Sequence, residues 1–302
     1  MPARPQTVGD WLQWAVRAYA RKKVALGQVA DNAHDEALYL LLRTLDLPLE
    51  SPRSVLRRKP TPEQAERIAA VFRRRIDDRV PAAYLTREAF LGGFRFHVDE
   101  RVIIPRSYFV ELLPQIADLV ECRAGSPARR PARRVADVCT GSGCLAVLLA
   151  HQFPGAKVDA VELSPDALAV ARFNVAELGL ARRIALHRSD VLDAVPPAKY
   201  DLILSNPPYV PTAELAALPE EFRREPALAL DGGRDGLDIV RRLLRQARTR
   251  LQPHGLVALE VGQARPALER AFPELDPQWM PTQDGEDCVC LVTADALRRW
   301  RG

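Results

Sequence analysis

The sequence predicts an α/β protein in which a mostly parallel β-sheet is preceded by a small helical domain and a β-hairpin. Three observations support this: helical periodicity near the start, a hairpin signal at Gly92 and Gly93, and strands that alternate with helices from Val135 onward. The chain has 302 residues, 47% of them hydrophobic, which is enough for two domains with a folded core. We expect a helical domain at residues 1–82, a hairpin linker at 83–106 and a second domain at 107–302.

The first domain is predicted to contain three or four short helices. Thr7 with Asp10, and Thr61 with Gln64, have the spacing of a capping box, and Pro62 stands at a first helical position. Apolar side chains then recur at helical spacing, and the third stripe comprises Ala65, Ile68, Ala69, Phe72 and Ile76. The opposite face of this third helix is expected to expose a basic row: Arg67, Arg73, Arg74, Arg75 and Arg79.

The second domain begins with a predicted helix at about 107–122, followed by an exposed connection at 125–127. Strand-like runs then start near residues 135, 157, 183, 200, 256 and 287, with helices expected at 143–152, 165–178 and 236–251. Strands that alternate with helices predict a parallel sheet covered on both faces.

Composition excludes several classes of protein. The longest strongly apolar run, residues 144–150, is too short to span a membrane, and the first residues lack the apolar region of a signal peptide. The five cysteines show no CxxC spacing, which favours reduced thiols in a cytoplasmic protein. The five histidines have no metal-ligand spacing, so we expect no metal.

The net charge of +4 is unevenly distributed. Residues 1–85 hold 15 basic and 10 acidic side chains, so this part of the chain is more basic than the remainder. A basic front suggests a partner near nucleic acid, although solvated helix faces would give the same count.

A glycine loop between the first strand and the first helix of the sheet is a candidate ligand site. Asp137 precedes Gly141 and Gly143, and a helix N-terminus follows. A dinucleotide site would read GxGxxG; the acidic residue instead fits a ligand with a cationic amino acid part. Glu162 and Asp190 follow the second and third strands, where carboxylates are placed to accept ribose hydroxyls and an adenine amino hydrogen.

The fourth strand leads directly into Asn206-Pro207-Pro208-Tyr209. Asn-Pro and Pro-Pro pairs also begin turns and end strands, so the motif alone has a purely structural explanation. At the carboxyl end of a strand in this sheet it indicates a catalytic loop.

With this motif, the chain resembles class I, Rossmann-like methyltransferases that use S-adenosylmethionine and modify planar amide or amino nitrogens. The resemblance implies a seven-stranded sheet and a methyl transfer that leaves S-adenosylhomocysteine. It implies that the Asn206 side-chain oxygen and the Pro207 carbonyl accept hydrogen bonds from the target nitrogen. It also implies that Pro208 stiffens the loop and Tyr209 packs on the target amide. The residues implied in cofactor binding are Asp137, Cys139, Thr140, Gly141, Ser142, Gly143, Glu162, Asp190 and Asn206.

Further motifs resemble the protein N5-glutamine methyltransferases: residues 102–107, 229–237 and 260–262. One branch of that family modifies peptide-chain release factors and another modifies ribosomal protein L3. Residues 31–37, 79–86 and 98–102, together with Cys139 where the release-factor branch usually has glycine, are closer to the ribosomal branch. The implied partner is L3, either as the free protein or within an assembling large ribosomal subunit, with an incidental ribosomal RNA contact through the basic helical domain.

Four alternatives stay open at this point. They are a release-factor glutamine methyltransferase, a DNA adenine-N6 methyltransferase, a non-catalytic binding module with the same fold, and a nicotinamide dehydrogenase. The loop spacing disfavours the dehydrogenase, and little of the chain is left over for a DNA target-recognition domain.

Overall fold

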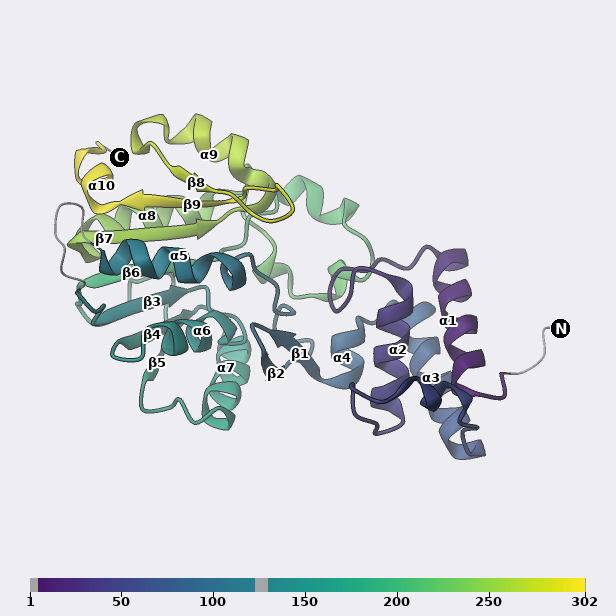
Figure 1. The fold of residues 1–302 in the computed structure, drawn as a ribbon. Coiled ribbons are helices and arrows are strands. Elements are labelled where there is room, and N and C mark those ends of the chain that lie inside the picture. The colour runs from purple at the N-terminus through teal and green to yellow at the C-terminus, as the bar shows by residue number, and fades with distance from the viewer. Residues whose placement is uncertain (1–4, 123–129, 302) are drawn as a thin grey trace.

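The computed structural model describes residues 5–122 and 130–301 and contains a helical part and a sheet part, joined by a short hairpin (Figure 1). The predicted connection at 125–127 lies outside the described residues. Within the described residues, no helix is long and apolar enough to cross a membrane.

The helical part consists of α1 (Val8–Lys22), α2 (Ala33–Thr44), α3 (Pro62–Ile76) and the short α4 (Ala82–Thr86), with a 3-10 turn η1 (Arg53–Arg57). The capping boxes at Thr7 and Thr61 are both formed, which explains where α1 and α3 begin. The three long helices enclose their own core, in which Trp11, Tyr19 and Phe72 are buried.

The predicted basic row on α3 is wrong at two positions, Arg75 and Arg79. Arg79 lies after the end of α3 and is half-buried, and its guanidinium bonds Glu221 at 2.9 Å. Arg75 is fully buried, and its guanidinium binds both carboxylate oxygens of Glu36, at 2.7 and 3.2 Å. Its position follows from helical spacing, since Arg75 lies three residues after buried Phe72. Arg73 and Arg74 are exposed as predicted.

The hairpin consists of β1 (Glu88–Leu91) and β2 (Phe94–His97), paired antiparallel around Gly92 and Gly93. The segment after it packs with α4 and the start of α7 in a small cluster that includes Tyr84, Val102 and Ile104.

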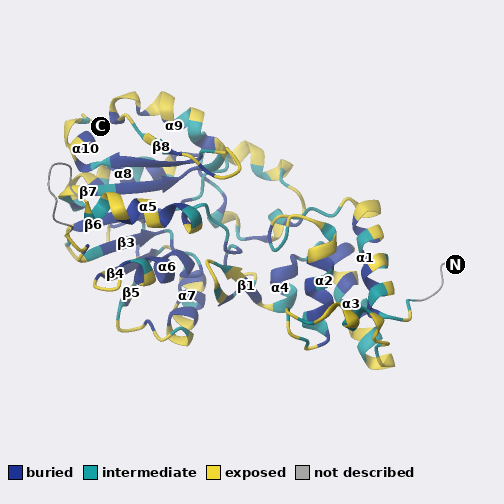
Figure 2. Ribbon diagram, in the orientation of Figure 1, coloured by how far each residue is buried: buried dark blue, intermediate teal, exposed yellow. Residues whose placement is uncertain are grey.

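The sheet contains seven strands in the order β5-β4-β3-β6-β7-β9-β8, of which the first five are parallel. Their bounds are β3 (Arg134–Val138), β4 (Lys157–Glu162), β5 (Ile184–Arg188), β6 (Tyr200–Ser205), β7 (Leu251–Glu260), β8 (Gln278–Met280) and β9 (Val289–Thr293). The strands are mostly dark blue in Figure 2, because helices cover both faces.

One face is covered by α5 (Phe109–Glu121), α6 (Cys144–Gln152) and α7 (Pro165–Glu177), and the other by α8 (Asp238–Arg250), α9 (Arg265–Ala271) and α10 (Ala294–Arg299). The short elements α9, α10 and β8 were not predicted from the sequence. The chain runs outward from β3 to β5 and returns to β6 beside β3, so a switch of strand order lies between β3 and β6. In open α/β sheets, ligands bind at the carboxyl ends of the strands at such a point.

Candidate active site

A cavity of about 470 Å³ opens at the carboxyl ends of β3, β4, β5 and β6. Residues 101–106 and Tyr108, which follow the hairpin, form a second wall of it. A third wall is the segment between β6 and α8, which contains the 3-10 turns η2 (Thr212–Ala217), η3 (Phe222–Arg224) and η4 (Ala227–Ala229). The switch of strand order therefore coincides with this cavity.

The glycine loop forms the floor of this cavity. Cys139, Thr140, Gly141 and Ser142 line it, whereas Asp137 and Gly143 lie beneath the lining and do not contact it. Cys139 has φ 65°, in the left-handed region that favours glycine. Burial raises the pKa of the Cys139 thiol, so the side chain stays protonated and acts as a small packing group.

Asp137 is a buried carboxylate with an unusual environment. Its Oδ2 accepts a hydrogen bond from Thr140 Oγ1 at 2.5 Å, while Oδ1 has no partner among the described residues. Burial raises the pKa of this carboxyl from 3.8 to about 7, against the opposing effect of the Thr140 hydrogen bond. A cationic group bound above the loop would stabilise the ionised form.

Glu162 ends β4 and faces the cavity. Its two oxygens each accept one backbone hydrogen bond, from Gly141 at 2.9 Å and from Ser164 at 2.8 Å. Burial raises the pKa of Glu162 despite these bonds. Each oxygen retains a lone pair, so the carboxylate can accept two hydroxyl groups from a ligand.

Asp190 follows β5 and also lines the cavity, where its carboxylate forms an ion pair with Arg242 on α8. Ser142 lines the floor, and its buried Oγ has no partner among the described residues. Among the described residues, no group of three or more His, Cys, Asp or Glu side chains could hold a metal ion.

Asn206, Pro207, Pro208 and Tyr209 line the same cavity as the glycine loop, Glu162 and Asp190. Ser205 Oγ donates to the Val138 carbonyl at 2.7 Å and so ties the end of β6 to the end of β3. Asn206 Nδ2 donates to the Arg106 carbonyl at 3.3 Å, which leaves the Asn206 side-chain oxygen free to accept. Burial raises the pKa of Tyr209 to about 12, so its hydroxyl is protonated at neutral pH.

Sequence reasoning assigned no role to Arg106, Phe222 and Glu225. Arg106 and Phe222 line the cavity, and Glu225 is buried and does not line it. The Arg106 guanidinium contacts both oxygens of buried Glu225 at 2.9 Å and lies 5.3 Å from the centre of the Phe222 ring. Glu225 also accepts from the Ile104 backbone at 3.2 Å. No local pattern marks this set, because Arg106 lies more than 100 positions before Phe222 and Glu225 in the sequence.

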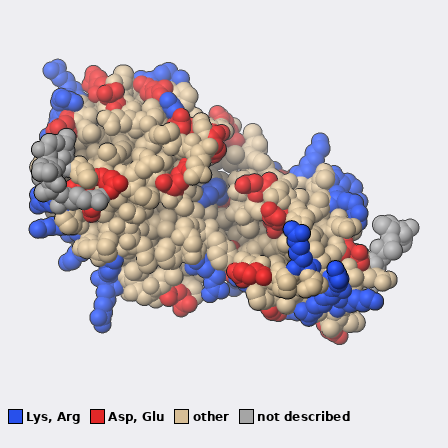
Figure 3. Space-filling view, in the orientation of Figure 1, with Lys and Arg blue, Asp and Glu red and all other residues tan. Residues whose placement is uncertain are grey.

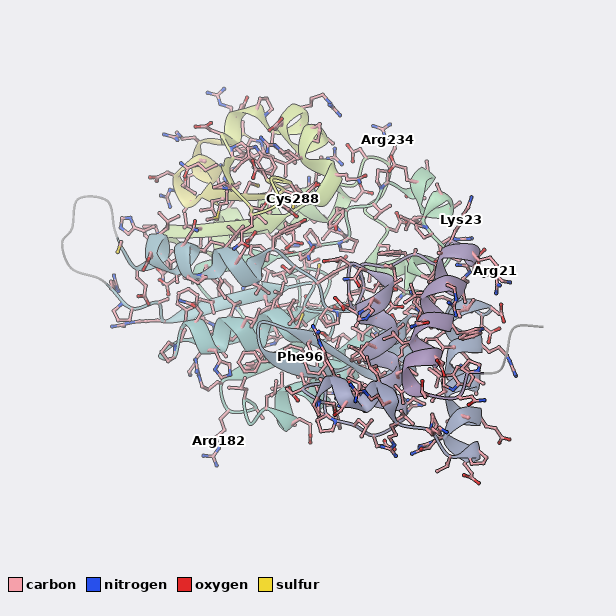
Figure 4. The ribbon with its side chains drawn as sticks, turned by 45° about the vertical axis from the view of Figure 1, so that its right-hand side comes forward. Arg21, Lys23, Phe96, Arg182, Arg234 and Cys288 are labelled. Atoms are coloured by element: carbon pink, nitrogen blue, oxygen red, sulfur yellow. The ribbon has the colours of Figure 1, made fainter. Side chains whose placement is uncertain are left out.

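The helical part also contacts the third wall. Glu221 is buried and accepts hydrogen bonds from the Ala25 backbone at 3.1 Å and from Arg79 at 2.9 Å. Figure 4 shows the end of α1, marked by Arg21 and Lys23, beside the segment that follows β6. The segment that leaves the Asn-Pro-Pro-Tyr motif is therefore anchored on the helical part.

A family model described as "Methyltransferase small domain" matches residues 126–233. The chain is 46% identical over 297 residues to a ribosomal protein uL3 glutamine methyltransferase of Bordetella pertussis, covering 97% of this chain and 96% of that protein. It is also 46% identical over 303 residues to the protein of the same name from Burkholderia pseudomallei, covering 98% and 97%.

A protein of the same name from Neisseria gonorrhoeae is 44% identical over 291 residues, covering 96% of this chain and 95% of that protein. Among solved structures, the hMettl16 catalytic domain in complex with the MAT2A 3′UTR hairpin 6 aligns with a TM-score of 0.51 and 16% identity, covering 77% of this chain and 81% of that chain. At this identity the likeness shows the fold alone.

Proposed function

The chain belongs to the family of ribosomal protein uL3 glutamine methyltransferases, and on that premise we propose that it methylates the side-chain amide nitrogen of a glutamine in uL3. The predicted class I methyltransferase fold is confirmed by the family match and by the mostly parallel seven-stranded sheet. uL3 is the protein named L3 in the sequence-based prediction.

A single observation supports the proposal most strongly. The Asn-Pro-Pro-Tyr motif, Glu162 at the end of β4 and Asp190 after β5 line one continuous cavity, although they come from separate strands. A methyl transfer requires the donor and the target nitrogen to lie in contact, in line with the bond that breaks. A cavity that joins a cofactor cradle to an amide-binding loop meets that requirement.

The residues of the cradle fit S-adenosylmethionine, which supplies an electrophilic methyl group on a positively charged sulfur when it is bound. Ser142 offers a buried hydroxyl without a partner among the described residues, and Glu162 offers lone pairs for the ribose. We assign the loop from Asp137 to Gly143 to the methionine part and Asp190 to the adenine.

The Asn-Pro-Pro-Tyr loop positions the side-chain amide of the target glutamine. An amide nitrogen is a poor nucleophile because its lone pair is delocalised into the carbonyl. Two acceptors, the Asn206 side-chain oxygen and the Pro207 carbonyl, hold its two N–H groups and favour a pyramidal nitrogen. Tyr209, protonated and half-buried, packs against the amide plane.

The reaction needs no strong base in this arrangement. The nitrogen lone pair forms the bond to the methyl carbon as the carbon–sulfur bond breaks, and the nitrogen then carries a positive charge. Its proton becomes acidic and leaves to water, which restores the amide. Orientation and electrostatic fit at Asn206 and Pro207 therefore supply most of the rate enhancement.

We propose that residues 1–82 contribute to recognition of uL3, with an incidental contact to ribosomal RNA, and that the reaction takes place in the cytoplasm. Figure 3 shows Lys and Arg side chains gathered over the outer part of the helical domain. Arg73 and Arg74 are exposed there, so they are available to a partner that carries negative charge.

The experiment that tests the proposal offers the purified enzyme three substrates with tritiated S-adenosylmethionine: uL3, a peptide-chain release factor and duplex DNA. Label on uL3 that disappears in Asn206→Ala supports the proposal. Label on the release factor but not on uL3 would assign the chain's activity to the other branch, and label on DNA would assign it to adenine methylation.

A further inference from the structure

Three sequence motifs outside Asn-Pro-Pro-Tyr have no role in the proposed reaction, yet the fold brings them together. Residues 102–107, 229–237 and 260–262 are far apart in the sequence. Each of them contacts the catalytic loop, which we define as residues 205–210. Their contacts with this loop indicate that all three motifs hold it in position.

Residues 229–237 run alongside the end of the catalytic loop. The Val210 N–H donates to the Leu230 carbonyl at 2.9 Å, and the Gly232 N–H donates to the Val210 carbonyl at 2.8 Å. The backbones approach so closely that a Cβ on Gly236 would lie 2.3 Å from the Tyr209 carbonyl oxygen. This motif fixes the main chain at Tyr209 and Val210.

Residues 260–262 fix the Tyr209 side chain. Gly262 has φ 46°, and a Cβ built on it would lie 2.5 Å from Cε2 and 2.7 Å from Cζ of the Tyr209 ring. Ordinary contacts of a Cβ begin near 3.4 Å. The ring therefore rests directly on the Gly262 backbone, and a methyl group there would displace it by about 1 Å.

Residues 102–107 fix the Asn206 side chain. The Asn206 amide donates through Nδ2 to the Arg106 carbonyl at 3.3 Å, so its oxygen must point away from that carbonyl. A reversed amide would place two oxygens against each other. The hydrogen bond to the Arg106 carbonyl therefore fixes the orientation of the Asn206 amide, with its oxygen placed to accept from the target nitrogen.

The Arg106 backbone is itself held from the third motif. Buried Glu260 accepts hydrogen bonds from Ser107 Oγ and from the Tyr108 N–H at 3.1 Å, immediately after Arg106. Glu260 ends β7 and lies next to the end of β6, because Ser205 pairs with Leu259. Motif 260–262 therefore acts on Tyr209 through Gly262 and on Asn206 through Glu260.

We propose that Gly262 and Glu260 are positioning residues that hold the Tyr209 ring and the Asn206 amide in the arrangement required by the target glutamine. The proposal rests on the proposed function, since it assigns the geometry of that same reaction. Neither residue belongs to the glycine loop or to the carboxylates assigned to the cofactor. We therefore expect the affinity of the protein for S-adenosylmethionine to be unchanged when either residue is replaced. A displacement of about 1 Å at a reacting group can cost about 100-fold in rate.

The test compares Gly262→Ala with Gly179→Ala. Gly179 has φ 70° and is exposed beyond the end of α7, with nothing within 4 Å of a built Cβ. Both variants carry the strain of a left-handed alanine, but only Gly262→Ala meets Tyr209. We expect kcat on uL3 to fall by about 100-fold in Gly262→Ala alone. The Kd for S-adenosylmethionine, measured by calorimetry, should be unchanged in both variants.

A crystal structure of Gly262→Ala provides a readout independent of turnover, in which the Tyr209 ring should be displaced relative to Gly179→Ala. An undisplaced ring or an equal kcat in the two variants would overturn the role of Gly262. If the wild-type enzyme does not methylate uL3 but the ring moves as expected, the proposed function fails while the contact between Gly262 and Tyr209 stands.

A second pair of variants tests Glu260. Glu260→Ala should lower kcat with little change in the Kd for S-adenosylmethionine, whereas Glu260→Gln should restore most of the rate, because its amide oxygen still accepts from Ser107 and Tyr108. A Gln variant as slow as the Ala variant would contradict the positioning role. This pair also keeps the proposal testable if Gly262→Ala does not fold.

Discussion

The buried carboxyl of Asp137 should make the stability of the protein fall as pH rises, and Asp137→Asn should remove that fall. Asp137 has no exposed surface, and burial raises its pKa from 3.8 to about 7 in the folded state. An ordinary pKa applies in the unfolded chain, so the folded state binds the proton more tightly. The protonated carboxyl therefore contributes its full share to the free energy of unfolding below pH 4. This contribution is lost as the pH rises to about 7.

The magnitude follows from the shift. One pKa unit corresponds to about 1.4 kcal/mol, so a rise from 3.8 to about 7 is worth about 4 kcal/mol. The Asn variant is uncharged and lacks this dependence. Any constant cost of the new amide, such as an unpaired N–H, cancels when the difference between the two proteins is followed across pH.

The assay is urea unfolding of the wild type and Asp137→Asn at several values between pH 4 and pH 8. The difference in free energy of unfolding should move by about 4 kcal/mol in favour of the variant across this range. Groups common to both proteins, including Glu260, cancel in the difference. A difference that does not vary with pH would refute the assignment of a raised pKa to Asp137.

Three further predictions concern catalysis, the helical domain and recognition. Asn206→Ala should lower kcat at least about 100-fold with an unchanged Kd for S-adenosylmethionine, whereas Glu162→Ala should raise that Kd first. Calorimetry measures the Kd and initial rates measure kcat. Equal losses of cofactor affinity and of kcat in both variants would mean that the roles are misassigned. Arg75→Met leaves the buried Glu36 carboxylate without its ion-pair partner, whereas Glu221 keeps Arg79. It should lower the free energy of unfolding by about 3–5 kcal/mol, measured in urea; a loss below about 1 kcal/mol, the value of a surface pair, would contradict the burial. Replacing Arg73 and Arg74 by Gln should raise KM for uL3 and leave the Kd for S-adenosylmethionine unchanged, and an unchanged KM would show that this basic face only interacts with solvent.

Local signals in the sequence predicted much of the fold. Capping boxes at Thr7 and Thr61 mark helix starts through contacts three residues apart, and they are formed in the structure. The long helices of the sheet domain lie close to their predicted bounds, because apolar periodicity reports directly which face is buried. The short elements α9, α10 and β8 escaped prediction, since three to seven residues carry too little periodicity.

Long-range pairing could not be read from the sequence. Arg75 was assigned to an exposed row because of its arginine neighbours, although its spacing from Phe72 placed it on the buried stripe. Its partner Glu36 lies 39 positions away on α2. The same holds for Glu221 and Glu225, whose segment shows no regular pattern and whose partners lie on the helical part and after the hairpin.

The candidate site was predicted residue by residue, but the sequence could not say which of those residues would face the cavity. Strand alternation and the turns of the glycine loop place Asp137 and Gly143 beneath its surface, whereas Cys139 and Ser142 line it. Motif spacing fixes the order of such residues along the chain. It does not fix the direction of each side chain, which depends on packing from α6 and β4.

We infer that this chain methylates a glutamine amide of uL3 through the Asn-Pro-Pro-Tyr loop. Tandem mass spectrometry of uL3 after incubation with enzyme and S-adenosylmethionine tests it most directly. We expect one added methyl group, located on the side-chain amide nitrogen of a glutamine and absent when the enzyme carries Asn206→Ala. Methylation on a lysine, an arginine or the N-terminus, or methylation that persists in Asn206→Ala, would contradict it.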